Sequence, residues 1–266
     1  MSDVQQASST EGTPARRGLW ASPVDRAGGW GLLLGLPGLI LLVALGWLAW
    51  RTNAQLDSIE ARQLAWPTLA KLWQQHLLLT LVSSLCVVGT AIPAGILLTR
   101  PGLRRWSGPV VAVANMGQSA PVIGVIVLLA IWVGFGFWTA VLALTIYAFL
   151  PVLANTITGL RGVDRSLVEA SRGMGNTQLQ TLVKVELPLA MPVIMTGVRT
   201  ALVLLVGSAS FGTFINAGGL GALITTGINL FRFNIIVSGA LMVAVLALFV
   251  DWFARVLEAI ATPKGL

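Results

Sequence analysis

Six long apolar stretches divide the chain. They lie near residues 30–50, 76–98, 108–133, 139–159, 190–212 and 236–257. Each approaches the roughly 20 apolar residues that an α-helix needs to cross a bilayer. Glycine, proline, serine and asparagine interrupt the third and the fifth stretch, so the limits of these two are less sharp. The pattern predicts an all-α integral membrane protein with about six transmembrane helices, and an even number of crossings places both termini on one side.

The composition agrees with lipid as the main surroundings of the chain. Hydrophobic residues make up 56% of it and charged residues only 10%, with a mean hydropathy of +0.84, whereas soluble domains carry about 25% charged residues. Residues 1–29 are polar and predict a disordered tail. Residues 30–75 predict a first transmembrane helix followed by an outside loop, and residues 259–266 predict a short C-terminal tail.

Basic residues are distributed unequally between the two sides of the predicted topology. One side carries twelve of them and the other carries four. The twelve are Arg16, Arg17, Arg26, Arg100, Arg104, Arg105, Arg161, Arg165, Arg172, Lys184, Arg255 and Lys264, and the four are Arg51, Arg62, Lys71 and Arg232. Loops on the cytoplasmic side are enriched in Lys and Arg. We therefore expect both termini in the cytoplasm, and the net charge of +7 does not indicate a nucleic-acid partner.

The long polar connection at residues 160–189 predicts a helix–turn–helix on the cytoplasmic side. The S/T-x-x-E/Q spacing of a capping box occurs at Ser166–Glu169 and again at Thr177–Gln180. Between them, Gly173 and Gly175 allow the first short helix to end, because glycine tolerates the left-handed conformation. Such a capped segment either lies on the bilayer surface or packs against a partner.

A second unusual segment, residues 212–234, lies on the opposite side. It contains Gly218, Gly219 and Gly221, followed by a short apolar piece at residues 222–230. Irregular backbone at membrane depth is tolerated only where protein or a water-filled cavity covers it. We expect a re-entrant element or gate here.

Sites for catalysis are missing from the sequence. It contains no Walker A loop, no H-E-x-x-H and no C-x-x-C. The single histidine, His76, opens an apolar run and is expected at a membrane interface, while Cys86 lies inside an apolar run. A membrane enzyme needs a cluster of His, Asp or Glu, so we predict neither an enzyme nor a metal site. Only Asp251 is an acidic residue within a span, so energy for transport must come from another subunit.

A specific motif lies in the cytoplasmic connection. The sequence resembles the E-A-A-x3-G-x9-I-x-L-P signature of permease subunits in binding-protein-dependent ABC importers, with serine for the second alanine and valine for isoleucine. The matching residues are Glu169, Ala170, Ser171, Gly175, Val185, Leu187 and Pro188. The resemblance implies that residues 161–188 form the segment that couples the permease to a cytoplasmic ATPase, within a permease core at residues 76–258.

Neighbouring stretches resemble the osmoprotectant branch of that family, which imports glycine betaine, choline and carnitine. They include Gly173-Met174-Gly175, Gly197-Val198-Arg199-Thr200-Ala201 and Ala217-Gly218-Gly219-Leu220-Gly221. The resemblance implies a prokaryotic inner membrane, a partner subunit that binds ATP, an extracytoplasmic solute-binding protein, and a second permease subunit in a homo- or heterodimer. It implies no cofactor bound by this chain. A permease for another solute, such as an amino acid, stays open.

Polar residues inside the spans are candidates for the translocation path. They are Gln118, Asn155 and Ser208 or Ser210. Small and amide side chains also hold transmembrane helices together, so packing is the competing interpretation. Arg199 lies inside the fifth span, where a charge is costly, and we expect it to be a structural charge paired with Glu186 or Asp251.

Overall fold

The computed structural model describes residues 29–261, which are helical throughout, apart from short connections. The long helices are α2 (Gly29–Asn53), α4 (Trp66–Thr99), α7 (Phe137–Arg161), α10 (Leu187–Ala209) and α12 (Phe233–Ala261). The shorter ones are α3 (Ser58–Gln63), η1 (Arg104–Trp106), α5 (Ser107–Ser119), α6 (Val122–Val133), α8 (Arg165–Gly173), α9 (Gln178–Thr181), the π-helical η2 (Leu182–Glu186), η3 (Ser210–Ile215) and α11 (Gly221–Asn229). The tails predicted at 1–29 and 259–266 lie largely outside the described residues.

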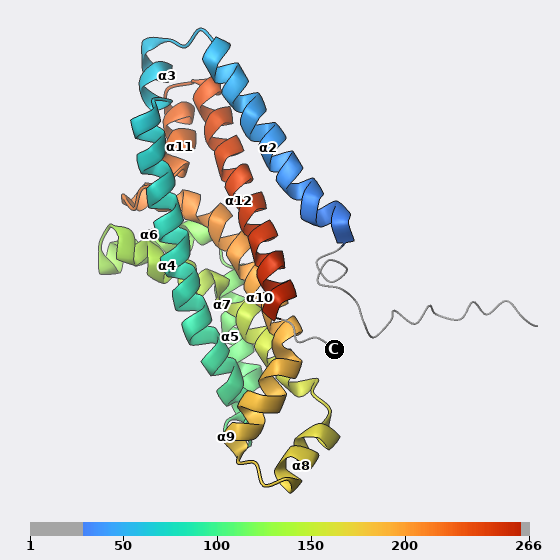
Figure 1. The fold of residues 1–266 in the computed structure, drawn as a ribbon. Coiled ribbons are helices and arrows are strands. Elements are labelled where there is room, and N and C mark those ends of the chain that lie inside the picture. The colour runs from blue at the N-terminus through green and yellow to red at the C-terminus, as the bar shows by residue number, and fades with distance from the viewer. Residues whose placement is uncertain (1–28, 262–266) are drawn as a thin grey trace, which may run out of the picture.

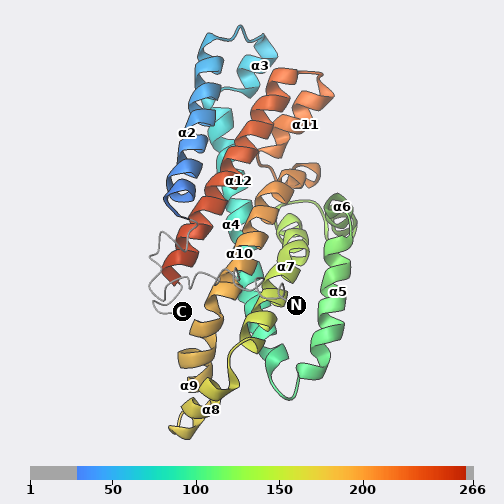
Figure 2. The ribbon, with the colours of Figure 1, turned by 90° about the vertical axis from the view of Figure 1, so that its right-hand side faces the viewer.

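The third apolar stretch is not one straight helix, as the sequence suggested, but two. The helical segments 104–119 and 122–133 meet at an angle of 97°. Pro121 explains the break, because proline disfavours the helical conformation in the residue before it. Ala120 accordingly has the extended angles φ −70° and ψ 143°. As a result, α5 runs along the bundle while α6 turns across it (Figures 1 and 2).

The connectivity supports six membrane crossings. Five helices are long and apolar enough to span a bilayer, and the bent pair raises the number to six if it counts as one span. At the end of the bundle that carries α8 and α9, the Arg161 side chain donates to Ser107 Oγ at 2.7 Å. The chain therefore leaves this end at the start of α5 and returns to it at the end of α7. The expectation of about six transmembrane helices is confirmed.

Helix α7 lies at the centre of the main core, where α4 and α10 pack against it. Small residues allow this close approach. A Cβ atom at Gly95 of α4 would lie 2.7 Å from Thr156 of α7, and one at Gly197 of α10 would lie 2.6 Å from the Pro151 carbonyl oxygen. Lipid tails give helices no hydrophobic reason to associate, so close packing of small residues is a main source of helix association in membranes.

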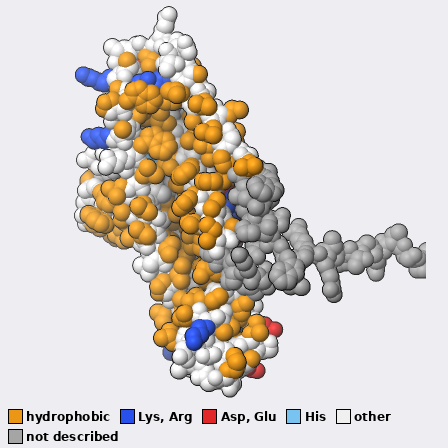
Figure 3. Space-filling view, viewed as in Figure 1, with side chains coloured by type: hydrophobic (Ala, Val, Ile, Leu, Met, Phe, Trp, Pro, Cys, Tyr) orange, Lys and Arg blue, Asp and Glu red, His pale blue; other side chains and the backbone are white. Residues whose placement is uncertain are grey.

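The exterior of the bundle is apolar. Hydrophobic side chains cover much of the face in Figure 3, and the few visible charged side chains lie mostly toward its two ends. Large hydrophobic side chains stand out from the long helices, including Leu42 at 68% exposed and Leu85 at 63%. Exposure of this kind fits a surface solvated by lipid.

Arg199 takes part in a charge network between α10 and α12. Its Nε lies 3.8 Å from Asp251 Oδ1, and its Nη1 lies 3.1 Å from Glu258 Oε2. Asp251 also pairs with Arg255, with Nε and Oδ2 2.8 Å apart. The predicted Arg199–Asp251 pair is confirmed. Glu258 was missed, although it follows Asp251 by two helical turns on the same face.

The alternative partner for Arg199, Glu186, was a wrong expectation. Glu186 instead pairs with Arg100, with its Oε2 2.5 Å from Nη2 and its Oε1 3.2 Å from Nη1. Glu186 and Arg199 belong to one continuous helical stretch and are thirteen residues apart, which corresponds to about 20 Å of helix rise. The two side chains cannot meet.

We predict that Arg199→Ala destabilises the protein, because it removes a cation that pairs with both Asp251 and Glu258. A cost of about 2 kcal/mol would lower the melting temperature of the purified chain by roughly 4–8 °C. Adding Glu258→Ala should recover part of the loss, since Asp251 and Arg255 then remain as a balanced pair.

The matched control is Arg199→Ala with Glu186→Ala, which removes a carboxylate from another pair and should lower the melting temperature further. Equal recovery with either second substitution, or no shift from Arg199→Ala alone, would contradict the network.

Candidate functional site

The segment that resembles the family motif projects from one end of the bundle as α8, a turn and α9 (Figure 1). Helix α8 begins at Arg165, and its cap is Asp164, whose Oδ1 accepts a hydrogen bond from the Ser166 backbone N–H at 2.9 Å. The same N–H lowers the pKa of the Asp164 carboxyl from its usual value. The predicted capping box of Ser166 with Glu169 is therefore wrong, because Ser166 already lies inside the first turn.

The second predicted capping box is confirmed. The Thr177 hydroxyl accepts from the Gln180 backbone N–H at 3.3 Å, and the Gln180 side chain accepts from the Thr177 N–H at 2.8 Å. Between the helices, Gly175 has φ +84°, a conformation that side chains with a Cβ rarely adopt. The turn is thus fixed by a glycine on one side and a reciprocal cap on the other.

Ser171, which departs from the alanine of the family motif, fastens the two short helices together. It is 1% exposed, and its Oγ lies 3.2 Å from Thr181 Oγ1 and accepts from Asn176 Nδ2 at 3.2 Å. Glu169, Ala170 and Gly175 are exposed, whereas Val185, Leu187 and Pro188 are half-buried where the chain enters α10.

The segment carries an apolar edge and borders a basic cleft. The edge consists of large exposed side chains, namely Leu167, Met174, Leu179 and Val183. The cleft, of about 460 Å³, lies between α8 and the ends of α4, α7 and η2. Its charged lining consists of Arg100, Arg104, Arg161, Arg165, Arg172, Glu169 and Glu186. Glu169 lies among these arginines and does not cap α8. The surface can therefore offer both apolar contacts and positive charge to a partner.

The glycine-rich segment at the opposite end packs tightly against α4. Gly218 and Gly219 have φ +80° and +99°, and a Cβ at Gly218 would collide with the Gln75 side chain. A Cβ at Gly221 would collide with the Ser210 carbonyl oxygen. The three predicted glycines thus lie together where the chain passes between η3 and α11, and their role in gating stays a prediction.

His76 holds this segment in place, a role that the sequence did not reveal. Its Nδ1 accepts from the Leu220 backbone N–H at 3.2 Å, and its Nε2 lies 3.0 Å from the Val206 carbonyl oxygen. Gln75 accepts from the Gly219 N–H at 3.2 Å. These partners assign the Nε2–H tautomer. His76 is 0% exposed and lies ten residues after Trp66, where α4 begins. Its location at a membrane interface stays a prediction.

The four candidate path residues lie on separate elements. Gln118 is half-buried near the end of α5, and Ser208 is buried near the end of α10. Asn155 donates to the Pro151 carbonyl of its own helix at 2.8 Å and borders Gly197, which fits a packing role. The Ser210 hydroxyl is buried without a partner among the described residues. Their role in translocation stays a prediction.

No group of three or more His, Cys, Asp or Glu residues within the described chain could hold a metal ion.

Known proteins resemble this chain in both sequence and fold. The model of the family described as "Binding-protein-dependent transport system inner membrane component" matches residues 91–260. The glycine betaine/carnitine/choline transport system permease protein OpuCB of Bacillus subtilis (strain 168) is 38% identical over 192 residues, 72% of this chain and 88% of that protein. The carnitine transport permease protein OpuCB of Listeria monocytogenes is 40% identical over 199 residues, 74% of this chain and 89% of that protein.

A third relative covers more of the chain. The osmoprotectant import permease protein OsmY of Salmonella typhimurium (strain LT2) is 36% identical over 221 residues, 82% of this chain and 92% of that protein.

Solved structures share the fold. The MetNI methionine ABC transporter in an inward-facing conformation gives a TM-score of 0.63 at 26% identity, over 73% of this chain and 96% of that chain. An amino acid ABC transporter with histidines gives a TM-score of 0.61 at 18% identity, over 77% and 99%. The family model covers more than half of this chain, and the relatives align along most of their own length. The chain therefore belongs to the family of inner membrane components of binding-protein-dependent transport systems.

Proposed function

We propose that the chain is the transmembrane permease subunit of an ATP-driven importer for an osmoprotectant such as glycine betaine, carnitine or choline. The observation that carries this substrate class is 36–40% identity to permeases named for these solutes, over most of both chains. The amino acid alternative rests on structural neighbours at 26% and 18% identity, and the lower of these indicates a shared fold only.

The substrate class can be tested on the assembled transporter. The chain is co-purified with its natural partners, and binding of glycine betaine, choline, carnitine and methionine to the solute-binding protein is measured. We expect binding of at least one quaternary amine and none of methionine. Selective binding of an amino acid would overturn the proposed class and leave the family unchanged.

We infer that α8 and α9 dock onto the ATP-binding subunit. Apolar side chains exposed outside the lipid-facing bundle are costly in water and favour a covered surface. Met174 at 77% exposed and Leu179 at 68% lie on this projecting end, beside the arginine-rich cleft. ATP would be bound and hydrolysed by the partner subunit, whose closure would move α8 and α9 together with the helices they join.

We predict that Gly175→Val abolishes substrate-stimulated ATP hydrolysis while membrane insertion stays intact. The φ of +84° at Gly175 is strained for valine, so the turn between α8 and α9 must change. Substrate-stimulated ATP hydrolysis by the reconstituted transporter should fall by about tenfold or more. A tenfold change corresponds to about 1.4 kcal/mol of free energy.

The control is Gly173→Val, the same substitution two residues earlier, at an exposed glycine with no atom within 4 Å of its added Cβ and no left-handed φ. It should stay near wild-type activity. Normal transport by Gly175→Val would show that the turn is not needed for coupling.

We predict that Gly218→Ala slows transport without lowering membrane abundance. A φ of +80° is strained for alanine, and the added methyl group displaces the end of Gln75, which accepts from the Gly219 N–H. Solute uptake into reconstituted vesicles measures the effect. The control is Gly207→Ala, which is exposed and has free space around its Cβ. Equal uptake by both variants would show that the glycine-rich segment does not act as a gate.

We predict that both termini are cytoplasmic. In a Cys86→Ala background, Ser9→Cys and Thr262→Cys should resist membrane-impermeant thiol reagents in intact cells. Ser58→Cys, at an exposed position of α3, should be labelled. The reverse labelling pattern would invert the orientation.

A further inference from the structure

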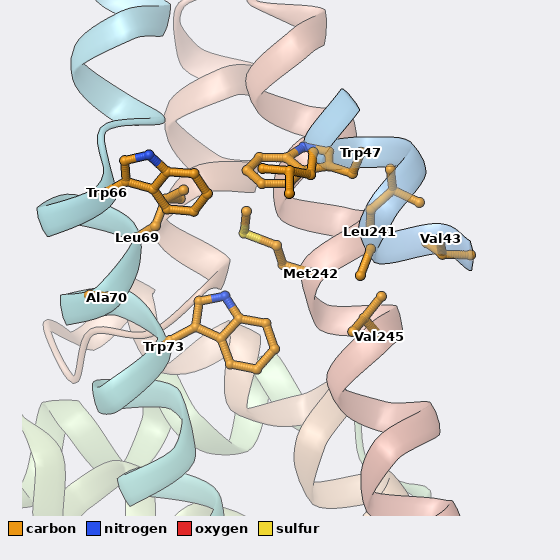
Figure 4. A pocket seen from close by; sticks show the side chains of 11 residues that line it. Val43, Trp47, Trp66, Leu69, Ala70, Trp73, Leu241, Met242 and Val245 are labelled. Atoms are coloured by element: carbon orange, nitrogen blue, oxygen red, sulfur yellow. The ribbon is translucent and has the colours of Figure 1, made fainter. Parts of the chain in front are cut away.

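An apolar slot of about 370 Å³ lies between α2, α4 and α12 (Figure 4). It is lined by Val43, Ala44, Trp47, Leu48, Trp66, Leu69, Ala70, Trp73, Leu241, Met242 and Val245. The slot exists because α2 packs along α12 and makes few contacts with α4. In Figure 4, Trp66 and Trp73 of α4 face Trp47 of α2 and Met242 of α12 across the gap. Within a membrane, such a gap between apolar walls is open to hydrocarbon.

A cation, Arg51, lies at the slot's mouth. Arg51 follows Trp47 by one helical turn, so the two side chains occupy the same face of α2. The Arg51 guanidinium carbon lies 4.5 Å from the centroid of the Trp66 ring. Its Nε and Nη2 donate to the Leu64 carbonyl oxygen at 3.0 and 2.7 Å. A guanidinium has five N–H donors, so three of those of Arg51 have no hydrogen-bond partner among the described residues.

The carboxylates of the adjoining loop are engaged elsewhere. Asp57 pairs with Arg232, with Oδ2 and Nη1 2.9 Å apart, and its Oδ1 caps α3. Glu60 accepts from Asn234 at 3.1 Å. Between residues 29 and 261, no ion pair neutralises Arg51. The slot therefore combines a hydrocarbon-lined interior with an unneutralised guanidinium at its entrance.

We propose that this slot binds one phospholipid, with an acyl chain between the three helices and the phosphate on Arg51. Arginine binds phosphate through charge-assisted hydrogen bonds with a fitting geometry. Three tryptophans could also suggest a cage for a quaternary ammonium group, but Arg51 already covers the Trp66 ring and repels a second cation. The lipid would join α2 to a bundle whose family-matched part begins only at residue 91. This inference does not depend on the transported solute.

The test uses the full chain, purified in detergent and stripped of lipid. Native mass spectrometry follows titration with dioleoyl phosphatidylglycerol or with dioleoylglycerol, which has the same chains and no phosphate. We expect one phosphatidylglycerol to bind at least about tenfold more tightly than the diacylglycerol, a difference of about 1.4 kcal/mol. Arg51→Gln should abolish this preference, whereas Arg51→Lys should retain part of it.

The matched control is Arg62→Gln, at an exposed arginine of the adjoining helix α3, which should leave both affinities unchanged. Ala70→Phe, which fills the slot from α4, should weaken binding of both lipids, and melting temperatures without lipid identify any variant that fails to fold. Equal losses from Arg51→Gln and Arg62→Gln, or equal affinity for the two lipids in the wild type, would overturn the proposal. If Ala70→Phe does not fold, the lipid affinities of Arg51→Gln and Arg62→Gln still decide whether Arg51 binds the phosphate.

Discussion

The hydrogen-bonding needs of the backbone inside lipid govern this structure. Hydrocarbon offers no partner to an N–H or a carbonyl group, so a spanning segment must satisfy its own backbone, and helices do so. One irregular segment is the turn between η3 and α11, where side chains of α4 supply the hydrogen-bond partners that lipid cannot. Gln75 accepts from Gly219, and His76 accepts from Leu220 while it binds the Val206 carbonyl. The buried histidine is thus a replacement for the hydrogen bonds that a continued helix would have made.

The same constraint explains why small residues matter at the centre of the bundle. With no water to expel, α4 and α10 associate with α7 through close contact of their surfaces. Gly95 and Gly197 permit that contact, and even a single added methyl group would meet side-chain or backbone atoms of α7. Asn155 lies against Gly197 in this contact, which shows how a polar residue that looks like part of a path from the sequence can serve packing.

The sequence predicted the features that depend on local pattern. The membrane-spanning stretches, the Thr177–Gln180 cap and the turn at Gly175 follow from composition and spacing within a few residues. The failures came from tertiary placement or from competition between neighbours. Asp164 displaced Ser166 as the cap because a better acceptor lay two residues earlier. Glu258 was missed as a partner of Arg199, although the predicted pairing with Asp251 already placed the same face of α12 against α10. Pro121 did give a signal of the bend, which the apolar run around it obscured.

The two candidate functional regions, the α8–α9 segment and the glycine-rich segment, lie at opposite ends of one continuous helical stretch. Residues 178–215 form α9, η2, α10 and η3 without interruption, over 38 residues. Ser171 fastens α8 to the start of this stretch, and the glycine-rich segment leaves its other end. Under the proposed coupling role, a displacement of α8 would therefore reach the opposite end of the bundle through packed helix. Two places in this stretch depart from regular α-helix. The turn at η2 is π-helical, a geometry that frequently marks functional sites, and Pro192 lies inside α10 without a backbone N–H to donate. Glu186 is the last residue of η2 and pairs with Arg100, the residue that follows α4. A movement of η2 must therefore carry this ion pair along or break it.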